Sequence, residues 1–354
     1  MANQCEQLVR FLRIEGAAVG LVRTNAPSWP AWVDAVPVLR AGFRLVPYLV
    51  ALWRSIGQAQ VVHVFANSGW AWHLLAAPAL AIARMRGVPA IINYRGGLAG
   101  EFFAAAPRHV LWALAGATQR VTPSAFLERV FSQHGLSAEI IPNIIDLSRF
   151  VALPLRAAGD APHLIVTRNL EAIYDIPTAL RAFALVRLRR PGAQLTVAGT
   201  GPERAALQQL AAELGVTDAV HFAGRIDNAS IAALYASANI VLNPSTADNM
   251  PISILESLAS GVPVVTTDAG GIPDLVSHEV TALLVPVGNP EAMATAALRL
   301  LDDAALAQQI HDRGLDEVSR YAWPQVREQW QAAYQRAVAS GTEALKAGPK
   351  PVRR

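Results

Sequence analysis

The sequence predicts an α/β protein of two domains, each built on a parallel sheet. Short β-branched runs alternate along the chain with segments of helical periodicity, which is the pattern of strand–helix–strand units. A length of 354 residues suits two domains better than one. After Phe150 the chain reads VALPLRAAGDAP, a proline-containing stretch without helical pattern that predicts a linker between the domains.

The order of the predicted elements follows from these patterns. In the first half, strands are expected at Val19–Arg23, Gln60–Phe65, Ala90–Tyr94, Arg120–Thr122 and Glu139–Ile141. In the second half they are expected at Leu164–Thr167, Gln194–Ala198, Val220–Phe222, Ile240–Asn243, Val262–Thr266 and Ala282–Val285. Amphipathic helices follow over about 290–340, and the Gly-, Pro- and Lys-rich stretch 341–354 predicts a disordered tail. The expected domains are therefore 1–150 and 151–320, followed by a helix over 321–340.

Composition excludes several classes of protein. Hydrophobic residues make up 53% of the chain and charged residues 16%, so global disorder is excluded. The formal charge of +3 lacks the clustered Lys and Arg of a nucleic-acid binder. A single cysteine, Cys5, excludes a disulfide framework and fits a reducing compartment. The longest apolar stretches, such as Ala71–Ala83, are shorter than the roughly 18 residues that span a bilayer. We expect a cytoplasmic protein, with contact to a membrane surface left open.

The most informative segment is 243–274, NPSTADNMPISILESLASGVPVVTTDAGGIPD. A strand ends at Asn243, a loop carries Asp248, and a helix starts near Pro251, a residue suited to a first helical turn. The N-terminus of that helix offers free N–H groups and the positive end of the helix dipole to a phosphate or sugar oxygen. Glu256 follows Asp248 after seven intervening residues, so both carboxylates can face one cleft. The alternative is an acid at the helix cap and a solvated helical glutamate.

This segment resembles the donor-binding signature of the family 4 retaining glycosyltransferases of the GT-B fold. Further resemblances follow in the right order: PNIIDLSRF at 142–150, LTVAGTGPERAAL at 195–207, VHFAGRI at 220–226 and ALYASANIVLNPS at 233–245. Together they cover nearly all of residues 139–288, whereas the first 138 match only in general layout. The resemblance implies two facing Rossmann-like domains, with 1–150 on the acceptor side and 151–320 binding the nucleotide-sugar donor. It also implies that the last helix, whose apolar stripe is Trp323, Val326, Trp330 and Tyr334, crosses back to the first domain.

The resemblance also implies roles for single residues. Arg168 would pair with the donor diphosphate, Asp248 would hold hydroxyls of the donor sugar, and Glu256 would accept hydrogen bonds from the ribose. These three form the expected catalytic set. The other residues expected to bind the donor are Gly199, Gly201, Arg225, Ile226, Asn249, Met250, Pro251 and Ile252.

The chemistry implied by the resemblance is retaining transfer without a metal or other cofactor, the nucleotide diphosphate sugar being a co-substrate. No Asp-x-Asp motif occurs in the sequence, and the pair Asp302-Asp303 lies on a helical stretch. One departure from the family stands out. Tyr174-Asp175 occupies the place of a Lys-Gly dipeptide that usually supplies a second cation near the arginine. Another basic residue then substitutes, or the phosphates are held more weakly, or catalysis is impaired.

Loops of the first half are expected to bind the acceptor. Arg95 and Gly96 lie in IINYRGG after one predicted strand, and Asn67 lies in FANSGW after another. A plain structural turn is the alternative for both loops, and His63 is more readily a packed strand histidine than a base. The segment Val38–Trp53, with Arg40, Arg44 and then Arg54, predicts either a surface helix on an anionic membrane that carries lipid-linked acceptors or a crossover helix on the sheet.

The chain opens directly on a predicted helix, Asn3–Glu15, whereas the family begins with a strand and a glycine-rich loop. We therefore expect the first strand of the N-terminal domain to be missing because the assigned start is too late. Asn3 and Gln4 would be the remnants of the loop on the acceptor side.

The leading hypothesis is a retaining glycosyltransferase of polysaccharide biosynthesis that acts on a glycan or lipid-linked acceptor. Two alternatives stay open. A nucleotide-sugar epimerase on the same fold would need acid and base side chains in the cleft, which these loops do not offer. A non-catalytic module that binds nucleotide sugars is kept open by the absent lysine.

Overall fold

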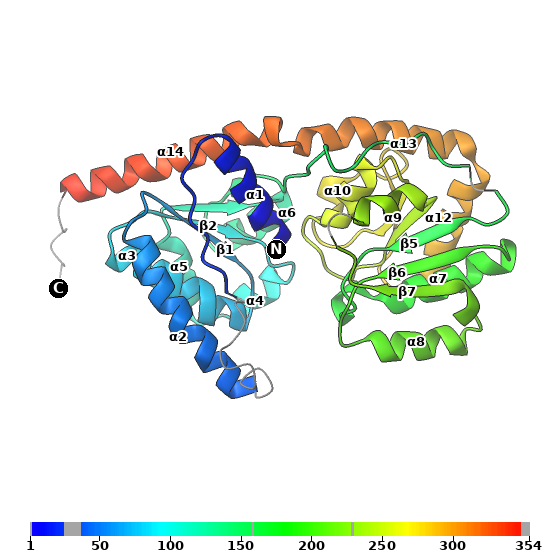
Figure 1. The fold of residues 1–354 in the computed structure, drawn as a ribbon, viewed down its shortest axis with the longest axis horizontal. Helices are drawn as coiled ribbons and strands as arrows, with labels where there is room; N and C mark the ends of the chain where they lie inside the picture. Colours follow the sequence, from blue (N-terminus) through cyan, green and yellow to red (C-terminus); the bar gives the residue numbers. More distant parts are fainter. Residues whose placement is uncertain (1, 25–36, 158, 228–229, 348–354) are drawn as a thin grey trace. The chain divides into compact units, whose positions relative to one another are not determined.

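A computed structural model shows two compact units (Figure 1), and it describes residues 2–24, 37–157, 159–227 and 230–347. The first unit comprises residues 1–142 with 326–354, and the second comprises residues 143–325. Each unit holds one parallel sheet flanked by helices, so the predicted α/β architecture is confirmed. The C-terminal segment of the first unit starts at Val326, which lies within the last helix of the chain.

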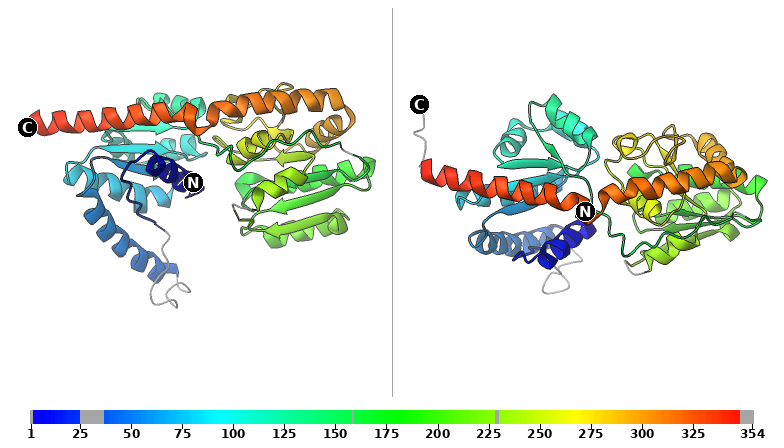
Figure 2. Two further views of the ribbon diagram at one scale, coloured as in Figure 1. Left: turned by 45° about the horizontal axis from the view of Figure 1, so that its top comes forward. Right: turned by 90° about the horizontal axis from the view of Figure 1, so that it is seen from above.

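In the described part of the first unit, four parallel strands lie in the order β1-β2-β3-β4. Their bounds are β1 Val62–Ala66, β2 Ala90–Tyr94, β3 Gln119–Thr122 and β4 Glu139–Ile140. The helices are α1 Ala2–Ile14, α2 Pro37–Ile56, the π-helix η2 Trp72–Ala76, α3 Ala77–Met85, α4 Ala99–Ala105, α5 Arg108–Ala115 and α6 Ala125–Gln133. Alternate residues of β1 and β2, such as Val64 and Ile92, pack into an apolar core with α2, α3, α5 and α6. Figure 2 shows α2 on the opposite side of this sheet from the C-terminal helix.

The strand predicted at Val19–Arg23 is wrong, because no strand is formed there. The carbonyl oxygen of Val19 instead accepts a hydrogen bond from Arg13 Nη2 at 2.7 Å. A backbone group that a sheet ladder would use is therefore taken by a side chain of α1. Among the described residues β1 is the edge strand of this sheet. Local β-propensity alone does not make a strand.

The second unit has a six-stranded parallel sheet in the order β10-β9-β8-β5-β6-β7. Its strands are β5 His163–Val166, β6 Gln194–Ala198, β7 Val220–Gly224, β8 Ile240–Asn243, β9 Val264–Thr267 and β10 Leu283–Val285. Its helices are η3 Ala172–Tyr174, α7 Ile176–Arg189, α8 Arg204–Glu213, η4 Thr217–Ala219, α9 Ile231–Ser237, α10 Ile252–Ala259, α11 Ile272–Leu275, α12 Pro290–Asp302, α13 Ala304–Val318 and η5 Ser319–Tyr321. β5 is buried on both faces: Leu164 and Val166 enter one core, and Ile165 enters the other.

The last helix, α14 (Trp323–Ala347), packs on the first unit from Val326 onward. The indole of Trp330 lies 4.8 Å from the imidazole of His63 on β1, and the Tyr334 hydroxyl lies 2.8 Å from His63 Nδ1. Arg336 forms an ion pair with Glu139 of β4 at 2.5 Å. Burial lowers the pKa of His63 to about 3, with the charge of Arg95 adding to the effect, so the imidazole is neutral and packed. This agrees with the interpretation of His63 as a structural strand residue.

The prediction that a disordered tail begins at residue 341 is corrected by the structure, because α14 continues to Ala347. Thr342–Ala347 reads TEALKA, whose Glu, Ala, Leu and Lys are strong helix formers. Gly341 is accommodated in the helix because it lies against Pro89, where a Cβ would come within 2.9 Å of the proline Cγ. Residues 348–354 lie outside the described residues.

Replacement of Trp330 by alanine should lower the free energy of unfolding by about 3–5 kcal/mol. The side chain is 2% exposed and anchors α14 on the first sheet, so its removal leaves a cavity against His63. Urea denaturation followed by circular dichroism measures the change. Trp70→Ala is the matched control, because Trp70 is 79% exposed and its loss should cost less than about 0.5 kcal/mol. Equal stability of the two variants would contradict the assigned packing.

Candidate functional site

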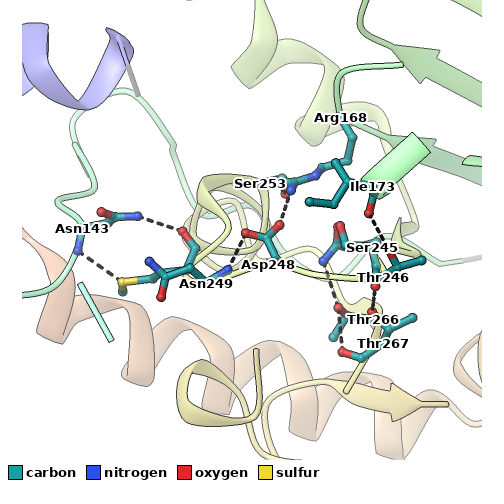
Figure 3. Close-up of polar contacts among 12 residues, drawn as sticks. Asn143, Arg168, Ile173, Ser245, Thr246, Asp248, Asn249, Ser253, Thr266 and Thr267 are labelled. Atoms are coloured by element: carbon teal, nitrogen blue, oxygen red, sulfur yellow. Dashed lines mark hydrogen bonds and ion pairs between the residues drawn. The ribbon is translucent and has the colours of Figure 1, made fainter. Parts of the chain in front are cut away.

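Arg168 and Asp248 meet at the carboxyl end of the second sheet. Arg168 follows β5 by two residues, and Asp248 lies in the loop after β8, the strand that pairs with β5. Arg168 Nη2 forms an ion pair with Asp248 Oδ2, and Nη1 donates to the hydroxyl of Ser253 on α10 at 3.3 Å (Figure 3). Both charged side chains are nearly buried, at 11% and 14% exposed. Ligands of open α/β sheets bind at this end of the strands.

The loop that carries Asp248 is held by its backbone. The amide of Gly271 donates to the Asp248 carbonyl at 2.9 Å, and a Cβ on Gly270 would collide with the same oxygen. Gly270 also has a φ of +56°, a conformation that glycine adopts without strain. The Asp248 carboxylate accepts from the Asn249 amide at 2.8 Å. The first glycine of the GG-I-P sequence, Gly270, is therefore required by the close approach of two loops.

The segment Asn249–Ile252 leads into α10 under a second set of contacts. The side-chain Nδ2 of Asn143 donates to the carbonyl of Met250 at 2.8 Å. The backbone nitrogen of Asn143 lies 3.2 Å from the Met250 sulfur (Figure 3). Pro251 has an extended ψ of 123° and precedes the first helical residue, Ile252. The first N–H groups of α10 consequently follow directly on the loop that holds Asp248.

Glu256 lies one turn further along α10 and is bonded to Tyr235 of α9. The Tyr235 hydroxyl donates to Glu256 Oε2 at 3.0 Å and lies 2.7 Å from the hydroxyl of Thr167, the neighbour of Arg168. Burial raises the pKa of Glu256 to about 7, against the opposing effects of Tyr235, Arg149 and Arg168. The three residues of the predicted catalytic set are thus gathered in one part of the second unit.

Two aromatic residues contribute to this site: Tyr235 was not singled out by the sequence reasoning, and Tyr174 was noted there only as a replacement for a lysine. Tyr235 lies within ALYASANIVLNPS, a segment recognised only as a whole. Tyr174 lies where a lysine was expected, and its ring centroid is 4.1 Å from the guanidinium carbon of Arg168. The spacing of six residues between Arg168 and Tyr174 was the one sequence signal that linked them.

Gly199 and Gly201 support the arginine through the backbone. A Cβ on Gly199 would collide with the carbonyl oxygen of Arg168, and one on Gly201 would collide with that of Leu170. The loop after β6 can therefore lie directly against the loop after β5. A contact of these glycines with a donor remains a prediction.

The remaining predicted donor residues lie farther along the sheet. Arg225 and Ile226 follow the edge strand β7, which is separated from β5 by β6. Arg225 is exposed. Within the described part of the chain, the hydrogen bonds and ion pairs of Arg168, Asp248 and Glu256 reach neither of these two residues.

The predicted acceptor residues lie in the first unit. Asn67 Oδ1 accepts from the amide of Ser68 at 2.9 Å, and a Cβ on Gly96 would collide with the Ser68 hydroxyl. The loops after β1 and β2 therefore meet. Arg95 packs over the ring of Phe65 at 5.5 Å, and burial lowers its pKa to about 10. Gln4 is buried on α1 and Asn3 is exposed there.

Comparison with known proteins finds that this chain is similar to sugar-transferring enzymes. Residues 161–303 match the family described as Glycosyl transferases group 1. An uncharacterised glycosyltransferase of Methanocaldococcus jannaschii is 32% identical over 152 residues, which is 43% of this chain and 39% of that protein. N-acetyl-alpha-D-glucosaminyl L-malate synthase of Bacillus anthracis is 32% identical over 155 residues, 44% of this chain and 40% of the other. The chain thus spans about two fifths of the length of these two relatives.

A longer match is the GDP-mannose-dependent alpha-(1-6)-phosphatidylinositol monomannoside mannosyltransferase of Mycobacterium tuberculosis, 28% identical over 321 residues, 82% of this chain and 83% of that protein. Among solved structures, Anabaena HepE in complex with UDP-glucose superimposes with a TM-score of 0.71 at 19% identity, over 92% of this chain and 88% of the other. Sucrose-phosphate synthase of Thermosynechococcus elongatus superimposes with a TM-score of 0.70 at 22% identity, over 84% of this chain and 79% of the other. The fold is therefore GT-B, as predicted. Over residues 161–303 the chain is similar to the group 1 glycosyltransferase family, and its longer relative is a mannosyltransferase.

The raised pKa of Glu256 predicts a pH-dependent cost to stability. A carboxyl group with a folded pKa of about 7 and an unfolded value of 4.5 stabilises the fold fully below pH 4.5, and this contribution is lost as pH rises through 7. Glu256→Gln removes the titration. We expect the stability of the variant relative to the parent to rise between pH 5 and pH 8, by up to roughly 3 kcal/mol. Urea denaturation at both pH values measures it, and a difference independent of pH would show that the carboxyl group is well solvated.

Proposed function

We propose that this chain transfers a sugar from a nucleotide diphosphate sugar to a glycan or lipid-linked acceptor, with retention of configuration and without a metal ion. The observation that carries the proposal is the convergence of Arg168 with Asp248 and the start of α10, beside the enclosed Glu256. The mannosyltransferase relative, which matches over 82% of this chain and is named as GDP-mannose-dependent, supports a nucleotide-sugar donor.

Arg168 is suited to a diphosphate leaving group. Its two terminal nitrogens contact Asp248 and Ser253, while its Nε is buried without a hydrogen-bond partner among the described residues. A buried unsatisfied donor costs about 1–3 kcal/mol, which a phosphate oxygen would relieve. The first N–H groups of α10 add the positive end of a helix dipole. Together these groups would stabilise the negative charge that develops on the departing diphosphate.

The two acids have different environments and different proposed roles. The Asp248 carboxylate, fixed by Arg168 and the Asn249 amide, would hold hydroxyls of the donor sugar. Glu256 would accept hydrogen bonds from the ribose, and the ionised carboxylate accepts them more strongly than the neutral acid does. Because its pKa is about 7, nucleotide affinity should rise as pH increases from 6 to 8 and should be insensitive to pH in Glu256→Gln. We propose that the acceptor is bound by the first unit, through Asn67, Arg95 and Gly96 with Asn3 and Gln4.

The activity test starts from a thermal-shift panel of nucleotide diphosphate sugars. The donor that stabilises the protein most is then incubated with glycan and lipid-linked acceptors in the presence of EDTA, and the anomeric configuration of the product is read by NMR. Donor binding without any product would leave a non-catalytic binding module as the function. Interconversion of the sugar without transfer would indicate an epimerase.

Arg168→Ala should lower kcat by about 100- to 1,000-fold, because it removes a preorganised charge at the leaving group. Initial rates at saturating donor measure the loss. The matched control is Arg189→Ala, because Arg189 is exposed near the end of α7 and its removal subtracts the same charge. Equal rates in the two variants would remove Arg168 from the mechanism.

We further propose that α2 contacts the cytoplasmic face of an anionic membrane. Val46, Val50 and Trp53 form an exposed stripe on α2, at 63%, 44% and 45% exposure, and Arg86 of the neighbouring segment packs on Trp53. Residues 37–100 contain six arginines and neither Asp nor Glu. No helix in the described ranges combines the length and apolar character needed to cross a bilayer. An apolar stripe bordered by cations is the pattern of an interfacial helix.

Vesicle sedimentation tests the membrane contact. The protein should sediment with phosphatidylglycerol-containing vesicles and much less with pure phosphatidylcholine, and added salt should weaken binding. Trp53→Glu should reduce binding by tenfold or more. Leu188→Glu is the control, because Leu188 is 78% exposed on α7 of the second unit and lies outside the proposed surface. Equal binding of both variants would refute the role of α2.

A further inference from the structure

Tyr174 lies directly on the guanidinium of Arg168. The ring centroid is 4.1 Å from the guanidinium carbon, well within the roughly 6 Å of a cation–π contact. The tyrosine is half-buried, and burial raises the pKa of its hydroxyl, with Arg168 opposing the effect. The phenol is therefore neutral, and its aromatic face is the part that meets the cation.

The turn that presents Tyr174 is fixed on both sides. The carbonyl of Ile173 accepts two hydrogen bonds from Thr246, from the amide at 2.9 Å and from the hydroxyl at 3.0 Å (Figure 3). After the ring, Asp175 has a φ of +41°, which is strained for a residue with a Cβ. Thr178 holds Asp175 there by donating to its carboxylate at 2.6 Å. Strained backbone of this kind persists only where surrounding contacts determine it.

Three contacts hold the guanidinium group of Arg168. Asp248 meets Nη2, Ser253 meets Nη1, and the Tyr174 ring covers one face of the plane. The Nε donor is buried and has no hydrogen-bond partner in the described ranges. A free arginine side chain carries about 2 kcal/mol of rotamer entropy. The ring and the two polar contacts confine that freedom before any ligand binds.

We infer that Tyr174 is a positioning residue, which holds the guanidinium plane of Arg168 so that the buried Nε donor is ready for a phosphate oxygen. This inference rests on the proposed function, because it takes the diphosphate as the ligand of Arg168. At position 174 the aromatic ring supplies orientation, whereas the lysine expected from the family resemblance would supply a positive charge. Tyr174 acts through Arg168 and does not itself touch the reacting atoms.

Three variants of the full chain separate orientation from simple packing. Tyr174→Phe keeps the aromatic face, Tyr174→Leu replaces it with apolar volume, and Arg168→Ala/Tyr174→Leu removes both partners. The affinities of UDP and GDP, and of uridine and guanosine, are measured by calorimetry, and kcat is measured with the donor found above. Tyr321→Leu is the matched control, because Tyr321 is a partly buried tyrosine of the same unit that bonds Glu317.

We expect Tyr174→Phe to stay within about twofold of the parent, and Tyr174→Leu to lower diphosphate affinity and kcat on the order of tenfold. Nucleoside affinity should not change, which a general loss of folding would not allow. In the Arg168→Ala background, the leucine substitution should have no further effect. A full additional loss in the double variant, or a parallel loss of nucleoside affinity, would overturn the inference.

The diphosphate measurements keep this test separate from that of the overall function. If the parent protein forms no product with any donor, the proposed transfer fails. A selective loss of diphosphate affinity in Tyr174→Leu would still support the positioning role. If product forms and Tyr174→Leu matches the parent in both affinity and kcat, the proposed transfer stands and the role of Tyr174 is refuted.

Discussion

The ion pair between Arg168 and Asp248 is the interaction around which the candidate site of the second unit is arranged. It joins two residues 80 positions apart, from the loops after adjacent strands β5 and β8, and both side chains are nearly buried. Loss of one partner from a buried pair leaves an uncompensated charge and typically costs about 3–5 kcal/mol. The glycines around the pair follow from this constraint. Gly199 and Gly270 let the neighbouring loops touch the backbone of Arg168 and Asp248, so that both charges sit in a closely packed frame.

Several features around that pair destabilise the folded protein but would favour the binding of a ligand. Glu256 has a pKa of about 7 because its carboxyl group is enclosed, and the buried Nε of Arg168 lacks a hydrogen-bond partner in the described ranges. Asp175 adds a strained backbone conformation beside Tyr174. Each feature lowers stability by itself, and each is relieved or used when hydroxyls or phosphate oxygens arrive. Three features that each reduce the stability of the fold therefore lie in one part of the second unit, and this supports a ligand site there.

The first unit has a different organisation, in which one helix from the end of the chain completes the packing of an N-terminal sheet. α14 covers His63 with Trp330 and Tyr334, and the imidazole is kept neutral by burial. On the other side of the sheet, α2 buries Tyr48 and Leu52 in the core while Val46, Val50 and Trp53 stay exposed. The same helix therefore serves as the crossover helix and as the proposed membrane surface. The two alternatives drawn from its sequence are compatible, because they use opposite faces.

The sequence by itself determined the parallel α/β architecture and nearly all of the strands, because these follow from local periodicity. It also singled out Arg168, Asp248 and Glu256, because the motifs that carry the family resemblance are only a few residues long. It failed at Val19–Arg23, where β-propensity alone did not form a strand, and at residue 341, where a glycine suggested a helix end but packs against Pro89. It could not reveal the roles of Tyr174 and Tyr235. Their partners, Arg168 for one and Thr167 with Glu256 for the other, are brought to them by strand order and helix packing. Such contacts join residues distant along the chain, so the tertiary structure alone decided them.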